Sequence, residues 1–242
     1  MNAIIRSIAA AVLTAAAAIA QGSTAVRVVL LQDQTGSTSW TRTPTLRYED
    51  LRPLMALIGQ RGGEIAIGLI RDQSNRGLVR LAITVADPVD LQPPTTWPSN
   101  PFLANRARAV FAAEKGKRER QRSAWEAEHA PMVDSFRADV ERLLAAPSNA
   151  RRTDVHGALR RADAFLAENP QIWGRPVYSA AIIVTDGDDN AHGAPAQWRS
   201  GAQILAVNGN DSIGVLARVQ PPPRRFESIQ AAIRHFIAAC PQ

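Results

Sequence analysis

Apolar residues gather in short runs that are separated by polar turns, and this spacing predicts strands alternating with helices. Runs rich in β-branched and aliphatic residues are typical of buried strands, and they occur at 25–31, 64–70, 78–85, 177–185, 204–207 and 213–216. Apolar residues at helical spacing predict helices at about 48–58, 102–145, 155–166 and 226–237, with a further short one near 195–201. No internal repeat is visible.

Three features of the sequence mark where these predicted elements end or connect. Four prolines between positions 87 and 101 predict a loop, and Pro131 predicts that the helical stretch 102–145 is broken in two. The turn between strands 64–70 and 78–85 is too short for a crossover helix, so these strands should form an antiparallel hairpin.

Alternating strands and helices predict an α/β fold. We expect a Rossmann-like three-layer sandwich with a mainly parallel central sheet, one antiparallel edge strand, and helices on both faces. In such sheets ligands bind beyond the carboxyl ends of the strands. Two polar, acidic turns, 33–37 and 186–190, directly follow predicted strands. These turns are therefore where a functional site is expected.

The composition of the 242 residues excludes a collagen, a coiled-coil rod and a disordered chain. The net charge is +6, of which segment 106–122 supplies five and Arg6 supplies one. Because the excess is local, a nucleic-acid-binding surface is not indicated, and the single aromatic residue of that segment, Phe111, offers no stacking platform. The segment is either a solvated helix face or a contact for an anionic surface or partner.

The N-terminus has the features of a secretory signal. Arg6 precedes an uncharged apolar run, 8–20, that ends in the small-x-small sequence Ala18-Ile19-Ala20. We expect residues 1–20 to be a signal peptide and the protein to be exported, to the periplasm or outside the cell. The run is shorter than the ~20 residues that span a bilayer, so no stable membrane span is expected after cleavage. The lone Cys240 allows no internal disulfide.

Short oxygen side chains follow the predicted strands and open a later helix. The first turn offers Asp33, Thr35 and Ser37, the helix start offers Thr153, and the second turn offers Asp186. Carboxylates and hydroxyls without His or Cys suit Mg²⁺ best, with Mn²⁺ or Ca²⁺ as alternatives, and do not suit zinc. The sequence thus predicts a divalent-cation site built from separate loops.

The sequence D-x-[ST]-G-S, a threonine opening a later helix, and an apolar strand ending in T-D-G resemble the von Willebrand factor A domain with its metal-ion-dependent adhesion site. The likeness covers about 25–238, and the stretch AAIIVTDGDDN is very similar to the fourth strand of that family. One departure is Thr35, where serine is commoner; it keeps the hydroxyl. A second is Thr38, where methionine is often seen.

The resemblance implies a domain over 21–242 with a basic helical insertion at about 88–150. It implies a non-catalytic function: binding a protein partner through an Asp or Glu of that partner. The implied metal ligands, direct or through water, are Asp33, Thr35, Ser37, Thr153 and Asp186. The residues expected to surround them are Gly36, Asp154, Gly187 and Asp188, and Asp188 and Asp189 are otherwise expected to be solvated.

A second family remains an alternative. Asp33-Gln34-Thr35-Gly36 also resembles the phosphorylated turn of haloacid-dehalogenase-like phosphatases, with Asp33 as the nucleophile and Mg²⁺ as its helper. That chemistry needs a lysine near the phosphoaspartate, yet Gln34 replaces it, and the chain's only lysines are Lys115 and Lys117. Ordinary turn chemistry would account for the first turn alone.

Overall fold

The computed structural model describes residues 24–36, 43–74, 77–85, 93–147, 150–191, 194–208 and 213–241. The predicted signal peptide, 1–20, lies outside them. The strands are β1 Ala25–Asp33, β2 Gly63–Ile70, β3 Val79–Ile83, β4 Gln171–Ile172, β5 Arg175–Val184, β6 Gln203–Val207 and β7 Arg224–Phe226. The helices are η2 Tyr48–Leu51, α2 Arg52–Arg61, α3 Pro101–Ala145, α4 Val155–Leu166, η3 Gly214–Arg218 and α5 Ile229–Ala239, where η marks 3₁₀ geometry.

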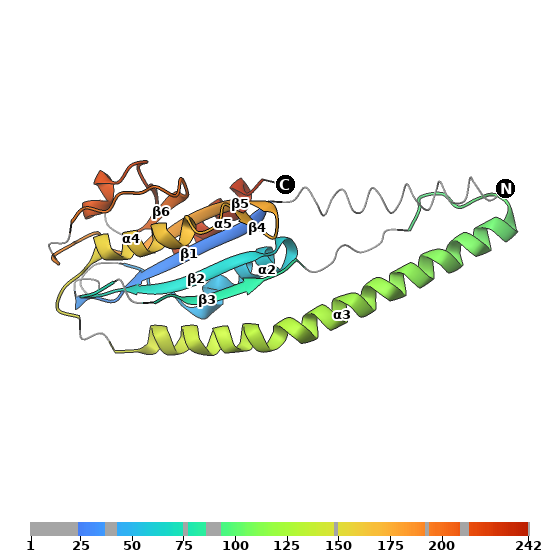
Figure 1. The fold of residues 1–242 in the computed structure, drawn as a ribbon, viewed down its shortest axis with the longest axis horizontal. Helices are drawn as coiled ribbons and strands as arrows, with labels where there is room; N and C mark the ends of the chain where they lie inside the picture. Colours follow the sequence, from blue (N-terminus) through green and yellow to red (C-terminus); the bar gives the residue numbers. More distant parts are fainter. Residues whose placement is uncertain are drawn as a thin grey trace.

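The strands form a sheet in the order β3-β2-β1-β5-β6-β7 (Figure 1). Neighbours pair in parallel except at the edge, where β3 runs antiparallel to β2, as the short turn between them predicted. The two-residue β4 adds an antiparallel pairing at the start of β5. The predicted fold class, a mainly parallel α/β sheet with one antiparallel edge strand, is confirmed.

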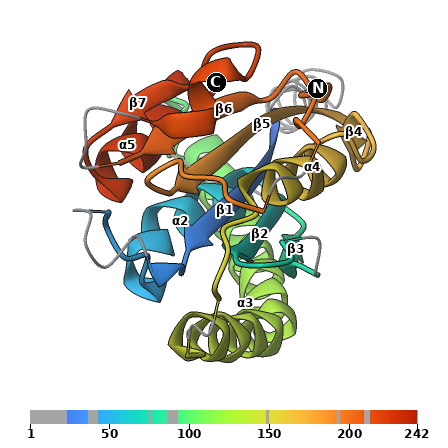
Figure 2. The same cartoon turned by 90° about the vertical axis from the view of Figure 1, so that its left-hand side faces the viewer.

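Helices cover both faces of this sheet (Figure 2). Alternate residues of β1 point to opposite sides, so that Val28 and Leu30 join a core with α2, α3 and α5, whereas Val29 and Leu31 join a second core with α4. A strand packed in this way is apolar along its whole length, which is why residues 25–31 lack the alternation of a half-exposed strand.

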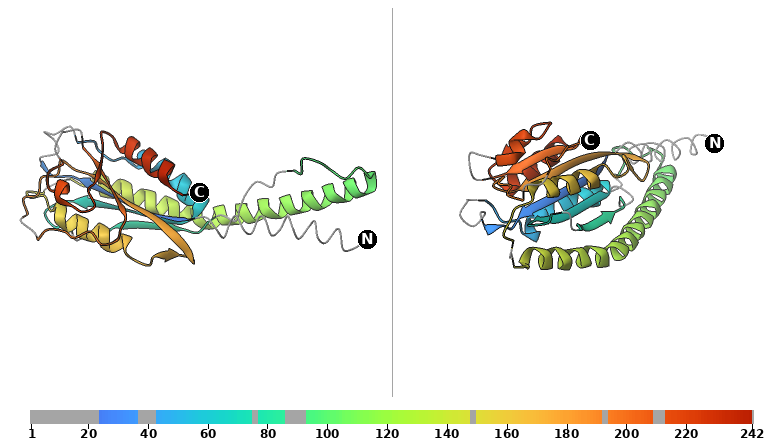
Figure 3. Two further views of the ribbon diagram at one scale, coloured as in Figure 1. Left: turned by 90° about the horizontal axis from the view of Figure 1, so that it is seen from above. Right: turned by 60° about the vertical axis from the view of Figure 1, so that its left-hand side comes forward.

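Helix α3 is continuous, so the predicted break at Pro131 is wrong. A proline inside a helix loses one backbone hydrogen bond and bends the axis, and the ribbon of α3 does bend along its length (Figures 1 and 3). Tertiary contacts hold the helix on both sides of the proline. Before it, Trp125 Nε1 donates to the Thr84 carbonyl at 3.2 Å; after it, Phe136 and Val140 enter the core.

The N-terminal part of α3, residues 101–124, projects away from the sheet, and we call it the arm (Figure 3). Residues preceding the helix pack back on it. Asn100 caps its first turn, the ring of Trp97 meets that of Phe111 edge-on at 6.0 Å, and the guanidinium of Arg108 lies 5.7 Å from the Trp97 ring centre. One side of the arm is therefore covered by its own chain.

The C-terminal third differs most from the predicted elements. Residues 214–218 form η3 where a strand was expected, residues 195–201 are irregular where a helix was expected, and β7 was not anticipated. The backbone at Gly214 packs directly on the turn after β5, with Val215 N donating to the Gly187 carbonyl at 2.9 Å. This tertiary contact, absent from any local pattern, overrides the strand propensity of the segment.

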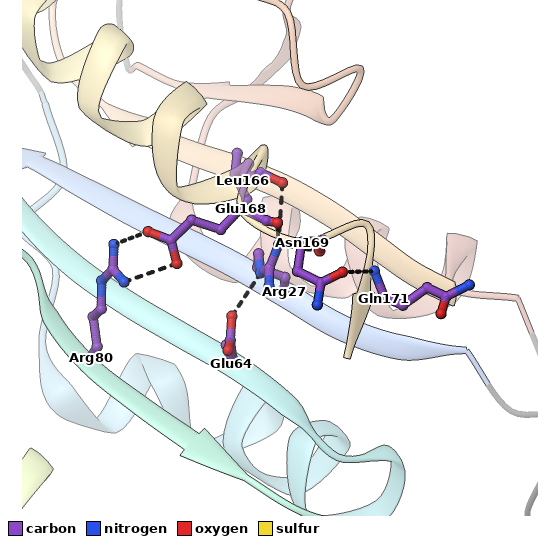
Figure 4. A network of polar contacts seen from close by, with 7 residues as sticks. All are labelled: Arg27, Glu64, Arg80, Leu166, Glu168, Asn169 and Gln171. Atoms are coloured by element: carbon purple, nitrogen blue, oxygen red, sulfur yellow. Dashed lines mark hydrogen bonds and ion pairs between the residues drawn. The ribbon is translucent and has the colours of Figure 1, made fainter. Parts of the chain in front are cut away.

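Arg27, near the start of β1, is buried and links the sheet to the C-terminal end of α4 (Figure 4). Arg27, on β1, donates from Nε to Glu64 on β2 at 2.7 Å. Its Nη1 donates to the carbonyls of Leu166, Glu168 and Asn169 at 3.4, 3.2 and 2.9 Å. Leu166 is the last residue of α4 and the other two follow its C-cap, so the guanidinium lies at the negative end of the helix dipole and satisfies carbonyls there.

Candidate metal centre

The turns after β1 and β5 lie side by side because these strands are parallel neighbours. Their register pairs Gln32 with Val184, so the residues that follow each strand meet at the same edge. A hydrogen bond of 2.7 Å from Thr185 Oγ1 to Asp33 Oδ2 joins the two turns. The structure thus brings Asp33 and the turn containing Asp186 together.

The first turn folds around the carboxylate of Asp33, which is buried. Its Oδ1 accepts hydrogen bonds from Thr35 N at 2.9 Å and from Thr35 Oγ1 at 2.8 Å. The hydroxyl of Thr35 therefore directs its proton toward the Asp33 carboxylate. Gly36 is exposed, and Ser37 lies outside the described residues.

Thr153 belongs to a third segment, the connection from α3 to α4, and is also buried. Its N–H donates to Asn190 Oδ1 at 2.6 Å, and its carbonyl accepts from the N–H groups of Asn190 at 3.2 Å and Ala191 at 3.3 Å. These bonds fasten Thr153 to the turn that follows β5. All three predicted segments therefore converge, although their sequence positions are far apart.

Asp154, expected to surround the metal ligands, caps α4 and bonds to the loop after β2. Its Oδ1 accepts from Gly157 N at 2.7 Å and caps α4, and its Oδ2 accepts from Ser74 N at 3.1 Å. Its own N–H donates to the carbonyl of Arg71 at 3.0 Å. These bonds connect α4 to the loop after β2 and fix the position of Thr153, the preceding residue.

The second turn contains a buried carboxylate whose hydrogen bonding is incomplete. Asp186 is buried, and its Oδ1 accepts from Asp188 N at 3.1 Å, but its Oδ2 has no hydrogen-bond partner within the described part of the chain. A buried carboxylate oxygen without a partner is costly, and in native proteins it calls for an ion or a water. This oxygen is the point at which the structure fits a bound cation.

Two further residues of this turn differ in exposure. Asp188 is exposed, as expected, whereas the prediction of a solvated Asp189 is wrong. The Asp189 carboxylate is buried, and it accepts from His156 N at 3.0 Å and from Ala191 N at 3.1 Å. It therefore helps to shape the turn and to anchor the first turn of α4.

The electrostatics of the site also favour a cation. Burial is the main influence that raises the pKa of Asp33; hydrogen bonds from Thr185 and Thr35 oppose it, and the negative charge of Asp186 adds to it. Among the described residues, neither Asp33 nor Asp186 forms an ion pair. Two neighbouring buried carboxylates without a basic partner would be stabilised by a bound metal ion.

The number of acidic ligands is small. No group of three His, Cys, Asp or Glu side chains suited to a metal occurs in the described ranges. A cation at this edge would therefore depend on the hydroxyls of Thr35 and Thr153 in addition to the two carboxylates. Such a set suits a hard cation such as Mg²⁺.

Sequence reasoning missed the residues that hold this site together. Thr185 is buried, donates to Asp33 and accepts from Gly187 N at 3.0 Å, so it bridges the two turns. Asn190 fixes Thr153. The position of Thr185 at a strand end, next to Asp186, was the available signal; nothing local to Asn190 pointed to a partner 37 residues away.

The site is also connected to the C-terminal end of α3. Gln34 Nε2 donates to the carbonyl of Leu144 at 2.8 Å, and Arg71 Nη2 donates both to Gln34 Oε1 at 2.6 Å and to the carbonyl of Ala146 at 3.1 Å. Gln34 is the position that a phosphatase of the alternative family fills with lysine. Lys115 and Lys117 lie on the arm, at the far end of the molecule from these turns (Figure 1).

None of the described helices combines the length and the apolar character needed to cross a membrane. No protein-family model and no curated protein matches the chain.

Proposed function

We propose that this chain is an exported, von Willebrand factor A-like binding module that uses a divalent cation, Mg²⁺ foremost, to bind a protein partner. The observation that carries the proposal is the buried Asp186 Oδ2, which has no hydrogen-bond partner among the residues that the structure describes, beside a second buried carboxylate whose pKa is raised. The residues that would hold the cation, directly or through water, are Asp33, Thr35, Ser37, Thr153 and Asp186.

The ligand set explains why a partner would bind there. Mg²⁺ takes octahedral coordination, so the five side-chain oxygens, each bound directly or through a water, occupy five positions and leave one open. An Asp or Glu of a partner is the natural sixth ligand, because a carboxylate is both a hard oxygen donor and a negative charge. The chain supplies position and charge in this proposal and no nucleophile or proton donor, so the proposed activity is binding.

Metal binding is the first test. We expect Mg²⁺ to raise the Tm of the protein, because a ligand that binds only the folded state stabilises it. Asp33→Ala and Asp186→Ala should abolish this shift in thermal denaturation, since each removes a buried carboxylate ligand. Asp134→Ala, which removes an exposed carboxylate on α3, is the control and should retain it.

Partner binding and hydrolysis are then separated. Immobilised protein should retain a partner from the exported protein fraction in the presence of Mg²⁺ and release it with EDTA, and the Asp186→Ala variant should retain none. Turnover of p-nitrophenyl phosphate that Asp33→Asn abolishes would instead establish the phosphatase and refute the binding module. If no divalent cation shifts the Tm of the unaltered protein, both the binding module and the Mg²⁺-dependent phosphatase are refuted.

A further inference from the structure

The arm carries a surface that the metal site does not use. Residues 93–100 cover one side of it through Trp97, whose ring contacts Phe111 and Arg108. Ala104, on that side of the helix, is buried. Apart from Ala104, every residue of the arm is exposed or partly exposed, and the helix that carries them projects from the sheet (Figure 3).

Six side chains on this outward side form what we call the arm face. At 3.6 residues per turn they fall within an arc of about 100°. They are Phe102, Leu103, Arg106, Val110, Lys117 and Arg120. The apolar members are unusually exposed for their type, with 75% of Phe102, 39% of Leu103 and 60% of Val110 accessible to solvent.

The charge on the arm face has one sign. Between residues 102 and 124 no acidic residue falls on this arc. The two glutamates of the arm lie on neighbouring rows, where Glu114 pairs with Arg118 at 3.3 Å and Glu119 pairs with Lys115 at 3.9 Å. The three cations of the arm face form no ion pair with any described residue.

We propose that the arm face docks on an anionic lipid bilayer, with Phe102, Leu103 and Val110 entering the headgroup region and the cations contacting lipid phosphates. The apolar side chains lie in the first three turns of the arm with Arg106 among them, and Lys117 and Arg120 follow farther along the same face. Apolar and basic side chains are the two groups through which an interfacial helix binds an anionic membrane surface. The face extends over about five turns of one projecting helix and carries charge of one sign. It therefore complements an extended anionic surface such as a bilayer.

The position of the arm makes this docking compatible with the proposed metal site. The arm projects from the end of the sheet opposite the carboxyl edge where Asp33 and Asp186 lie (Figures 1 and 3). A molecule bound through the arm face would therefore leave the metal-site edge open to a partner. The lipid-docking proposal does not depend on whether that site binds a metal.

Vesicle sedimentation tests the proposal. The protein beginning at Gln21 contains every described helix and strand and avoids the apolar N-terminal run. It should sediment with phosphatidylglycerol–phosphatidylcholine vesicles and not with phosphatidylcholine alone. Each Lys or Arg near an anionic surface strengthens binding about fivefold, so Lys117→Gln/Arg120→Gln should weaken it about 25-fold.

A matched control separates docking from simple charge attraction. Arg118→Gln/Arg122→Gln removes the same charge from the other side of the helix and should weaken binding less than about fivefold. Phe102→Ser/Val110→Ser should remove the binding that persists at about 0.5 M NaCl, where electrostatic attraction is screened. Unchanged circular dichroism and Tm should accompany each variant, because none of these four arm-face side chains is buried.

Three results would overturn the proposal. The first is failure of the unaltered protein to bind anionic vesicles. The second is equal loss in the two double-charge variants, which would indicate attraction without a docked face. The third is a dimer in light scattering that Phe102→Ser/Val110→Ser dissociates while vesicle binding is absent, which would assign the arm face to a second copy of the chain.

Discussion

Protonation of Asp33 should weaken binding of the proposed cation. Protons compete with a cation for its carboxylate, so affinity is constant above the pKa of Asp33 and falls as the pH drops below it. Because burial raises this pKa, the fall should begin above the usual range for aspartate, which centres near 3.9. Isothermal titration with Mg²⁺ at a series of pH values measures it, and affinity that stays constant down to about pH 4 would contradict it.

The same raised pKa has a consequence for the metal-free protein. The folded state holds the Asp33 proton more tightly than the unfolded chain, so this residue favours folding at low pH and opposes it as the pH rises through the folded pKa. Asp33→Asn removes this dependence. We therefore expect the variant to exceed the unaltered protein in Tm near neutral pH without metal, and the difference to shrink on acidification.

The turn after β5 has no room for a side chain at Gly187. Its φ is 83°, and a Cβ would lie 2.1 Å from the carbonyl oxygen of Ile213, which is backbone and cannot turn aside. Gly187→Ala should therefore lower the free energy of unfolding by about 2 kcal/mol or more. Urea denaturation measures the change. Gly59→Ala, with open space around it in α2, should be neutral or stabilising.

At the scale of elements, Arg27 joins β1, β2 and the end of α4. It is 3% exposed at its side chain, whereas Arg80, which pairs with Glu168 at 2.6 Å, is 47% exposed. Arg27→Met leaves Glu64 and three carbonyls without their donor, so we expect a loss of about 3–5 kcal/mol in urea denaturation. Arg80→Met breaks an exposed pair and should cost about 1 kcal/mol or less. Equal costs would show that burial does not set the strength of this contact.

The elements also show which sequence signals are sufficient. Long apolar runs predicted the bounds of β1, β2 and β5 to within two residues, because a strand buried on both faces is apolar along its whole length. Pro131 led to the wrong prediction of a helix break, because tertiary contacts hold α3 on both sides of the proline. The expected strand at 213–216 became η3 because its backbone meets Gly187, which lies close in space but distant in sequence.

At the scale of the whole molecule, the arm should be dispensable for folding. Trp125 Nε1 lies 3.2 Å from the Thr84 carbonyl, so the residues on either side of the segment to be removed are already in contact. Replacing residues 86–124 by a short Gly-Ser linker should change the Tm by less than about 3 °C and leave the Mg²⁺ response intact. Loss of folding in this variant would show that the arm stabilises the sheet.

The sequence by itself determined the alternation of strands and helices, the antiparallel edge strand, and the strand-end positions of Asp33 and Asp186. Local patterns suffice there, because burial dictates apolar periodicity and polar residues must resume where a buried strand ends. Three features follow from tertiary contacts instead: α3 remains whole through Pro131, Thr185 and Asn190 link the three site segments, and the side chain of Asp189 is buried. Each of those depends on a contact between segments distant in sequence, and no local pattern of apolar and polar residues encodes such a contact.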